Sequence, residues 1–200
     1  MELYIVRHGQ TDWNKEKKMQ GRADMPLNEE GRAQAERVGR ALKNINFDAV
    51  FASPLQRALD TASIIAGHND IIVDERIYEI ALGKLEGLVY RNLEKAGGEL
   101  YETVQAFFMS PDKYIPTEGG ESYQNLLART GEFLENLPKS HPDQKILLVS
   151  HATSIHAMLA YIKKTPLKDL WLVPIVNGSV TRAVYGEEGY IILDEGLVLD

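Results

Sequence analysis

Four short runs of apolar residues, many of them β-branched, have the length of buried strands. They are Leu3–Val6, Ala49–Ala52, Ile71–Val73 and Ile146–Val149. Within each run the apolar residues follow one another and do not alternate with polar ones. That pattern is typical of strands covered on both faces, as in a parallel sheet.

Segments with helical periodicity lie between these runs. One begins after Asn28, a candidate N-cap followed by two glutamates that suit a first helical turn. Pro54 is predicted to open a second helix, Ser122 to cap a third, and a fourth is predicted to follow His151. Strands that alternate with helices predict an α/β fold with a mostly parallel sheet.

Two parts of the chain depart from this alternation. The late runs Val180–Tyr185 and Tyr190–Leu193 flank the turn-forming stretch Gly186–Gly189, which predicts a C-terminal antiparallel hairpin. Residues from about 88 to 121 are rich in Gly, Pro and aromatic side chains, and we expect them to form a lid-like insertion over one end of the sheet. The 200 residues predict a single domain spanning 1–200.

The composition narrows the classes of function. A hydrophobic content of 44 % and a charged content of 26 % are ordinary for a soluble globular protein. The net charge of −7 argues against a general nucleic-acid binder, although a local cluster of arginines can still hold an anion. Without cysteine, disulfides and thiolate chemistry are excluded. The sequence shows neither a signal-peptide pattern nor a long apolar run, so we expect a cytoplasmic protein with no membrane partner.

Reactive side chains fall just after the predicted strands. Arg7 and His8 follow the first strand, Arg57 the second, Glu79 the third and His151 the fourth. In open parallel sheets, ligands bind outside the carboxyl ends of the strands, so these five side chains are expected at one edge. Each of them alone has an ordinary structural explanation, and only their shared placement predicts a function.

This set of side chains suits chemistry on phosphate. Two guanidinium groups offer paired donors to a tetrahedral anion, and nearby helix N-termini add backbone N–H groups. An imidazole can attack phosphorus, while a carboxylic acid can protonate the leaving oxygen and then activate water. Histidines and carboxylates are not clustered at metal-ligand spacing, so a metal-free route is expected.

The same residues lie in motifs that resemble the histidine phosphatase superfamily, which includes the cofactor-dependent phosphoglycerate mutases. In chain order the motifs are Leu3–Asn14 with Arg7-His8-Gly9 inside it, Gln20-Gly21, Pro26–Asn28 with Gly31, Ser53–Leu55 with Arg57-Ala58 and Thr61-Ala62, Glu79 with Gly83–Gly87, Gly119–Ser122, and Ser150-His151. The resemblance covers nearly the whole chain. It implies a phosphoglycerate mutase-like fold, a three-layer α/β/α sandwich.

The resemblance also implies roles. His8 would be the phosphorylated nucleophile and Glu79 the proton donor, while Arg7, Arg57 and His151 would hold the phosphoryl group. It implies no metal or other cofactor. The remaining substrate-binding candidates are Asn14, Gln20, Gly21 and Ala152.

Two positions depart from the family's common pattern. Ala152 stands where glycine is frequent, but its small side chain still allows a backbone N–H to approach phosphate. The stretch Lys84–Gly87 reads Lys-Leu-Glu-Gly where Asp-Trp-Glu-Gly is common, so the pocket wall is expected to differ there.

Catalysis requires distinct charge states at the site. His8 must attack as a neutral imidazole, and Arg7 and Arg57 favour this by lowering its pKa. His151 would assist more as a cation, which bound phosphate favours, and Glu79 must arrive protonated. We therefore predict opposite protonation of the two histidines in the phosphate complex, and NMR showing both in one state at neutral pH would contradict it.

Other candidates have weaker support. His156 is expected to be structural, and His68 and His141 to lie on the surface. The insertion's aromatic residues either pack it against the sheet or line the pocket and favour substrates with an apolar part. Those considered for the pocket are Phe107, Phe108 and Tyr114.

Three functions remain in contention: a phosphatase acting on small phosphate monoesters, a phosphoglycerate mutase, and a phosphate-binding protein without turnover. A mutase needs further cations around its site, which Ile80–Leu82 and the acidic Glu94–Glu102 do not supply. Thr165–Leu167 and Leu170-Trp171 resemble the compact bacterial broad-specificity phosphatases, so hydrolysis is favoured. The substrate's identity, and whether the chain is a monomer or a homodimer, stay open.

Overall fold

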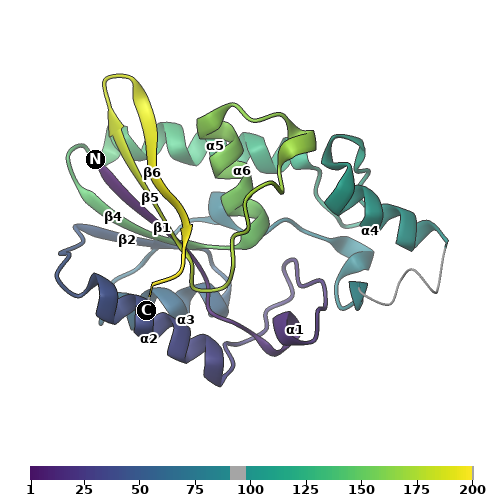
Figure 1. Cartoon of the computed structure of the whole chain (residues 1–200), viewed down its shortest axis with the longest axis horizontal. Coiled ribbons are helices and arrows are strands. Elements are labelled where there is room, and N and C mark those ends of the chain that lie inside the picture. Colours follow the sequence, from purple (N-terminus) through teal and green to yellow (C-terminus); the bar gives the residue numbers. More distant parts are fainter. Residues whose placement is uncertain (91–97, 200) are drawn as a thin grey trace.

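The computed structural model describes residues 1–90 and 98–199, and its strands and helices follow the predicted alternation (Figure 1). The strands are β1 (Glu2–Arg7), β2 (Ala49–Ala52), β3 (Ile72–Val73), β4 (Lys145–Ser150), β5 (Val180–Gly186) and β6 (Gly189–Leu197). The helices are α1 (Asp12–Lys15), α2 (Glu29–Leu42), α3 (Gln56–Ala66), α4 (Glu99–Met109), α5 (Tyr123–Ser140) and α6 (Ala152–Lys163).

The six strands form one sheet in the order β3-β2-β4-β1-β5-β6. The first four are parallel to one another, while β5 runs antiparallel to β1 and β6 antiparallel to β5. The prediction of a mostly parallel sheet with a C-terminal antiparallel hairpin is therefore confirmed. Because β1 and β4 are neighbours, Arg7 lies beside Ser150 and the chain leaves both strands at the same edge.

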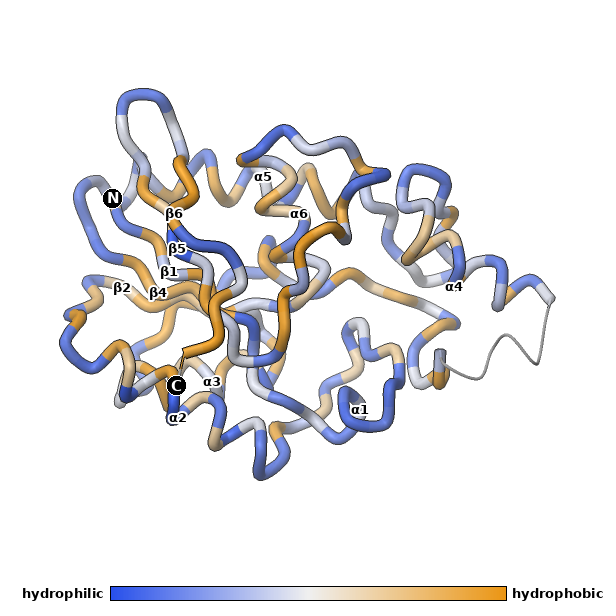
Figure 2. The backbone as a smooth tube through the Cα atoms, viewed as in Figure 1, coloured by the Kyte–Doolittle hydropathy of each residue, from blue (hydrophilic) through white to orange (hydrophobic). Residues whose placement is uncertain are grey.

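Helices cover both faces of the sheet, which confirms the three-layer α/β/α sandwich. On one face Leu3 and Ile5 of β1 pack with side chains of α5 and α6, such as Phe133 and Met158. The side chains of Tyr4 and Val6, which alternate with those of Leu3 and Ile5, lie on the other face and pack against α2 and α3. Figure 2 shows hydrophobic residues concentrated along the strands and hydrophilic ones on the outer turns.

Helix starts follow the predicted caps in two cases. The side chain of Asn28 accepts a hydrogen bond from the N–H of Gly31 at 2.9 Å, and that of Ser122 caps α5 in the same way. Pro54 does not open α3, which begins at Gln56. At that start the N–H of Gln56 donates at 2.9 Å to the carboxylate of Asp24, a residue from a distant loop.

The third predicted strand is shorter and more exposed than expected. β3 contains only two residues and pairs with β2 alone, at the edge of the sheet. Ile72 and Val73 are 44 % and 52 % exposed, so the prediction of a strand buried on both faces is wrong here. An apolar run does not show whether its strand will be central or at an edge.

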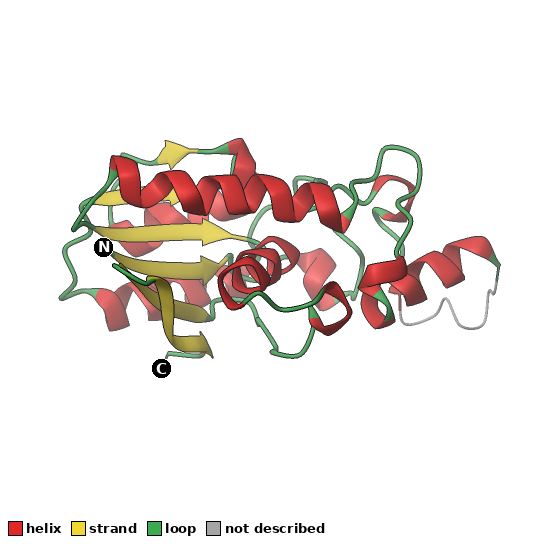
Figure 3. Ribbon diagram, turned by 90° about the horizontal axis from the view of Figure 1, so that it is seen from above, coloured by secondary structure: helices red, strands yellow, loops and turns green. Residues whose placement is uncertain are grey.

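The predicted insertion includes residues 91–97, which lie outside the described residues. Its described part carries α4, which extends beyond the end of the sheet opposite the β5–β6 hairpin tip (Figures 1 and 3). Buried side chains of this part, among them Val104 and Phe107, form a separate apolar cluster with Tyr123 of α5 and Ala157 of α6. The insertion therefore stands over the carboxyl ends of the parallel strands. No helix within residues 1–90 and 98–199 has the length and apolar character to cross a membrane.

His156, on α6, is a core residue, as the sequence indicated. It is 5 % exposed, and its ring packs edge-on against Trp171 with the ring centroids 4.6 Å apart. Burial lowers the pKa of His156 to about 4, and the charges of Arg7 and Lys163 act in the same direction. In the unfolded chain His156 binds a proton near its ordinary pKa of 6.5, whereas in the folded chain it binds one only at a lower pH.

Stability is therefore expected to fall as the pH drops from about 6.5 towards about 4, because protons then bind preferentially to the unfolded chain. The contribution of His156 reaches about 3 kcal/mol at most. Replacing His156 by glutamine should destabilise the chain near pH 7, and this difference should narrow by about 2 kcal/mol near pH 5. Urea unfolding at both pH values measures this, with the exposed His68→Gln as control. An equal difference at both pH values would contradict it.

Candidate active site

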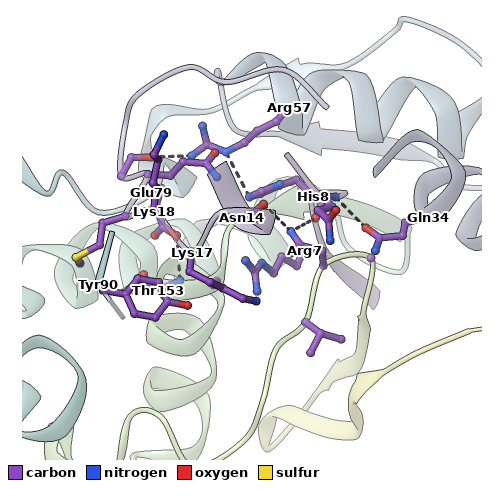
Figure 4. A pocket seen from close by; sticks show the side chains of 18 of the residues that line it. Arg7, His8, Asn14, Lys17, Lys18, Gln34, Arg57, Glu79, Tyr90 and Thr153 are labelled. Carbon is purple, nitrogen blue, oxygen red and sulfur yellow. Dashed lines mark hydrogen bonds between the residues drawn. The ribbon is translucent and has the colours of Figure 1, made fainter. Parts of the chain in front are cut away.

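The carboxyl ends of β1 and β4 and the starts of α3 and α6 surround one cavity of about 550 Å³. Arg7, His8, Arg57 and Glu79 line it (Figure 4). The candidates Asn14, Gln20, Gly21 and Ala152 line it as well. His151 is fully buried behind the wall, in contact with Arg57 and outside the lining set. The structure thus brings all the predicted residues together, with His151 one layer deeper than expected.

His8 presents one ring nitrogen as a hydrogen-bond acceptor. Its Nδ1 lies 2.7 Å from the carbonyl oxygen of Gly9, and since a carbonyl can only accept, Nδ1 carries the proton. Nε2 therefore holds the free electron pair, and Nε of Arg57 donates to it at 3.3 Å. Burial, then the charges of Arg57 and Arg7, holds the pKa of His8 well below its ordinary value. His8 is accordingly a neutral imidazole at pH 7.

The backbone around His8 depends on two glycines in close contact. A Cβ on Gly9 would lie 2.2 Å from the carbonyl oxygen of Gly31, and one on Gly31 would lie 2.0 Å from that of Gln10. Neither position has room for a side chain, so both glycines are needed for α2 to begin directly against the loop that follows β1. The N–H of Gly9 donates to Oγ1 of Thr61 at 3.1 Å, which fixes the loop on α3.

Arg57 connects the two histidines. It is 1 % exposed, and its Nε–H is shared between Nε2 of His8 and Nδ1 of His151, at 3.3 Å each. Its Nη1 and Nη2 donate to the carbonyl oxygens of Ala23 and Gly21, both at 2.7 Å. Burial lowers the pKa of Arg57 to about 10, so it remains a cation at pH 7. This bonding places one fixed positive charge beside both imidazoles.

His151 is held as a neutral ring in this arrangement. Because Nδ1 accepts from Arg57, Nε2 carries the proton and donates to Oγ of Ser53 at 2.7 Å. Burial, followed by the charges of Arg57 and His8, holds the pKa of His151 well below 6.5. The expected cationic His151 concerns the phosphate complex and stays a prediction.

Arg7 lines the cavity and has one donor that is unpaired within the ranges that the structure describes. Its Nη1 donates to the carbonyl oxygen of Ile175 at 2.6 Å, while its Nε is buried without a hydrogen-bond partner among the described residues. Burial lowers the pKa of Arg7 to about 10, with Glu79 opposing the shift, so the guanidinium remains charged. A buried, unpaired N–H on a cation is suited to an oxygen of an anionic ligand.

Glu79 lies at the N-terminus of α6. One carboxyl oxygen accepts from the N–H of Ile80 at 2.8 Å and of Ser154 at 3.2 Å, and the other accepts from the N–H of Thr153 at 3.1 Å. These hydrogen bonds fix the orientation of the carboxyl group at the start of the helix. That Glu79 arrives protonated stays a prediction.

Two further polar candidates are held by their neighbours. Oδ1 of Asn14 accepts from the N–H of Thr11 at 3.1 Å and from Nδ2 of Asn177 at 3.2 Å. Both bonds involve the amide oxygen of Asn14 and neither involves its amide N–H groups. Nε2 of Gln20 donates to Oγ1 of Thr11 at 2.6 Å, while its Oε1 is buried without a partner in the described part of the chain.

Asn177 was not among the site residues predicted from the sequence. Its Nδ2 also lies 3.0 Å from the backbone oxygen of His8, so it joins the loop after β1 to Asn14. Asn177-Gly178 has the composition of a turn, which was the available signal. Its position at the site follows from the pairing of β5 with β1, which local sequence does not indicate.

The cavity has an apolar wall and a cationic rim. Phe107, Phe108, Tyr90 and Trp171 line one side. Tyr114 does not reach the cavity, because it is 5 % exposed and packs behind Phe107 with ring centroids 5.2 Å apart. Of the three aromatic candidates, Phe107 and Phe108 therefore line the cavity, and Tyr114 takes the packing role that was the alternative.

Positive charge dominates the lining although the chain is acidic overall. The cationic lining residues are Arg7, Lys17, Lys18, Arg37 and Arg57, against the single carboxyl group of Glu79. A local reversal of this kind was foreseen from the arginines in the sequence, and it suits an anionic ligand. Within residues 1–90 and 98–199, no three His, Asp or Glu side chains are grouped so as to hold a metal ion.

The sequence profile of the histidine phosphatase superfamily (branch 1) matches residues 3–196. The chain belongs to this superfamily. Relatives of this histidine phosphatase include phosphoglycerate mutase-like protein 4 of Arabidopsis thaliana, 37 % identical over 90 % of this chain and 77 % of the relative. The uncharacterized phosphatase PhoE of Bacillus subtilis is 32 % identical over 95 % of this chain and 91 % of its own.

A solved structure, YhfR of Bacillus stearothermophilus, superposes on this chain with a TM-score of 0.89. It is 33 % identical, and the match covers 98 % of this chain and 96 % of that one. Fold and family are thus established together. The relatives' names include both phosphatases and mutases, so family membership does not by itself choose between hydrolysis and transfer.

Proposed function

We propose that this histidine phosphatase hydrolyses small phosphate monoesters, without a metal, through a phosphohistidine at His8. The observation that carries the proposal is the state of His8: Nε2 is unprotonated, and it accepts a hydrogen bond from the fixed guanidinium of Arg57 at 3.3 Å. A nucleophile and a charge that stabilises phosphoryl oxygens are thus held together. The cavity, at about 550 Å³, has the size of a small-molecule site.

The proposed reaction has two steps. Nε2 of His8 attacks phosphorus as the bond to the leaving oxygen breaks, and Glu79 gives that oxygen its proton. Water then attacks phosphorus as the bond from phosphorus to Nε2 of His8 breaks, a proton of the water passes to the Glu79 carboxylate, and phosphate leaves. Arg7 and Arg57 stabilise the phosphoryl oxygens in both steps, which is the task that a metal ion performs in other phosphoryl transfers.

A specific observation supports each of the two enzymatic alternatives. The wall made by Phe107, Phe108 and Trp171 offers no charge to a second phosphate, which supports hydrolysis. Lys17, Lys18 and Arg37 at the rim are the cations that a mutase would use on a bisphosphorylated intermediate. A phosphate-release panel over many monoesters, run beside a bisphosphoglycerate-dependent mutase assay, decides between them. Strong isomerisation without net phosphate release would overturn hydrolysis, and turnover in neither assay would leave a phosphate-binding protein.

The aromatic wall predicts a preference for substrates with an apolar part. The Phe108 ring packs 5.5 Å from those of both Tyr90 and Trp171. Replacing Phe108 by alanine should lower kcat/KM for aryl phosphates relative to glycerol phosphate by about fivefold, since one aromatic contact contributes about 1 kcal/mol beyond its buried area. Steady-state kinetics on both substrates measure the ratio, with Phe47→Ala, outside the cavity lining, as control. An unchanged ratio in Phe108→Ala would show that the wall does not contact substrate.

A further inference from the structure

Arg129, on α5, contacts the segment that carries Glu79, and all five of its N–H groups donate hydrogen bonds. Its Nε and Nη2 donate to the two carboxyl oxygens of Glu121, at 2.7 Å and 2.9 Å. Its Nη1 donates to the backbone oxygens of Arg76 and Tyr78, at 2.7 Å and 2.8 Å. Its Nη2 also donates to the backbone oxygen of Glu79, at 3.2 Å. A guanidinium group has five N–H donors, so this arrangement is saturated.

Glu121 holds the same segment from its other end. Its N–H donates to the backbone oxygen of Ala81 at 2.8 Å, and its Oε2 accepts from the N–H of Ala81 at 3.4 Å. Arg22 donates through Nη2 to Oε2 of Glu121 at 3.2 Å and through Nε to the backbone oxygen of Glu79 at 3.1 Å. Two arginines therefore hold the backbone carbonyl of the proposed proton donor.

The pair of Arg129 and Glu121 is largely shielded from water. Their side chains are 16 % and 12 % exposed. Burial tends to raise the pKa of Glu121, but its hydrogen bonds to Arg129 and the charges of Arg129 and Arg22 outweigh it, so the pKa is lowered. The carboxylate is thus ionised at neutral pH. Removing Glu121 leaves the mostly buried charge of Arg129 without its counterion, and removing Arg129 leaves Glu121 paired only with the more exposed Arg22.

The Glu79 segment has little regular structure to hold it. It follows a three-residue 3-10 helix, Glu75–Ile77, and the residues up to Ala81 belong to no helix or strand. The backbone oxygens of Tyr78 and Glu79 are bound by side chains, those of Arg129 and Arg22 among them. Glu121 is also the last residue of the insertion that supplies Phe107 and Phe108 of the aromatic wall. Its hydrogen bonds therefore join that insertion to the segment that carries Glu79.

We propose that the Arg129–Glu121 pair is the positioning element of Glu79, and that it sets the reach of the Glu79 carboxyl group to the leaving oxygen. This rests on the proposed function above. In the first step the Nε2–P bond of His8 forms, the bond from phosphorus to the leaving oxygen breaks, and the Glu79 proton moves to that oxygen. A displacement of about 1 Å in a reacting group can cost about a hundredfold in rate.

The test uses the leaving group, because only a poor one needs the proton. Alkyl phosphates release a strongly basic oxygen, whereas p-nitrophenolate leaves without protonation. Replacing Arg129 by methionine should lower kcat for glycerol phosphate about tenfold more than kcat for p-nitrophenyl phosphate. Arg129→Lys should show the same loss, since an ammonium group has only three donors and cannot reproduce the fork. Both rates come from one protein sample, so a reduced folded fraction cancels in their ratio.

Arg76→Met is the matched control, since the Arg76 side chain lies on the same segment but bonds to Asp74 and Glu132 and not to Glu79. It should leave the ratio unchanged. Should Arg129→Met fail to fold, Glu121→Gln carries the same test with the shape preserved. Equal loss on both substrates in the Arg129 and Glu121 variants would overturn the positioning role alone. A wild-type chain that hydrolyses neither substrate would overturn the proposed function, and this inference with it.

Discussion

Replacing His8 by alanine is expected to abolish phosphate release from every monoester that the wild-type chain hydrolyses. In the proposed mechanism Nε2 of His8 forms the covalent bond to phosphorus, and no other imidazole lines the described cavity. Loss of a nucleophile typically costs at least about 10⁴-fold in kcat. Release of inorganic phosphate from several monoesters measures the effect.

The fold should survive this change well enough for the test. His8 is 3 % exposed and its ring bonds only to Gly9 and Arg57, so the variant loses a few contacts at the sheet edge and none in the apolar clusters. Thermal unfolding beside the activity assay shows whether the chain is folded. His68→Ala, at an exposed histidine, should keep full activity. A folded His8→Ala variant that keeps substantial activity would remove His8 from the chemistry.

Replacing Glu79 by glutamine should lower kcat for alkyl phosphates by about 10² to 10³, with a clearly smaller loss for p-nitrophenyl phosphate. Glutamine keeps the shape of the side chain but cannot supply a proton to the leaving oxygen. It also places an NH₂ group where the carboxylate accepted hydrogen bonds from Thr153, Ser154 or Ile80, so stability should fall by about 1 to 3 kcal/mol.

Kinetics on the two substrates, together with urea unfolding, separate these effects. Glu75→Gln is the control, since Glu75 is exposed and lies four residues earlier in the same segment. Equal losses on alkyl and aryl esters in Glu79→Gln would mean that Glu79 does not protonate the leaving group. The Arg129 variants should likewise lose more kcat on alkyl than on aryl phosphates, but the difference should be smaller than in Glu79→Gln.

Most of the fold could be predicted from local pattern. Continuous apolar runs located the central strands, and Asn28 and Ser122 marked two helix starts because their side chains cap free N–H groups. The failures have tertiary causes. Pro54 was expected to open α3, but the helix begins at Gln56, whose N–H binds Asp24 from a distant loop. The Ile71–Val73 run gave no indication that its strand would lie exposed at the sheet edge.

The candidate site could be predicted because parallel strands deliver their following residues to one edge. His8 and His151 follow the neighbouring strands β1 and β4, and that geometry required no knowledge of the loops. Depth and bonding could not be predicted in this way. Two features depend on side-chain packing between segments far apart in sequence. His151 lies behind Arg57, and Asn177 reaches the backbone of His8. Aromatic residues of the insertion looked alike in sequence, yet Phe107 lines the cavity and Tyr114 packs behind it.

The most direct test of the central claim is to trap the covalent intermediate. Wild-type chain is mixed rapidly with excess p-nitrophenyl phosphate, quenched with alkaline denaturant, and its peptides are mapped by mass spectrometry. We predict one added phosphoryl group on the peptide that contains His8, stable in alkali and lost in acid, and absent from His8→Ala. Turnover with no phosphorylated peptide at any quench time, or with the group on another residue, would contradict a phosphohistidine at His8.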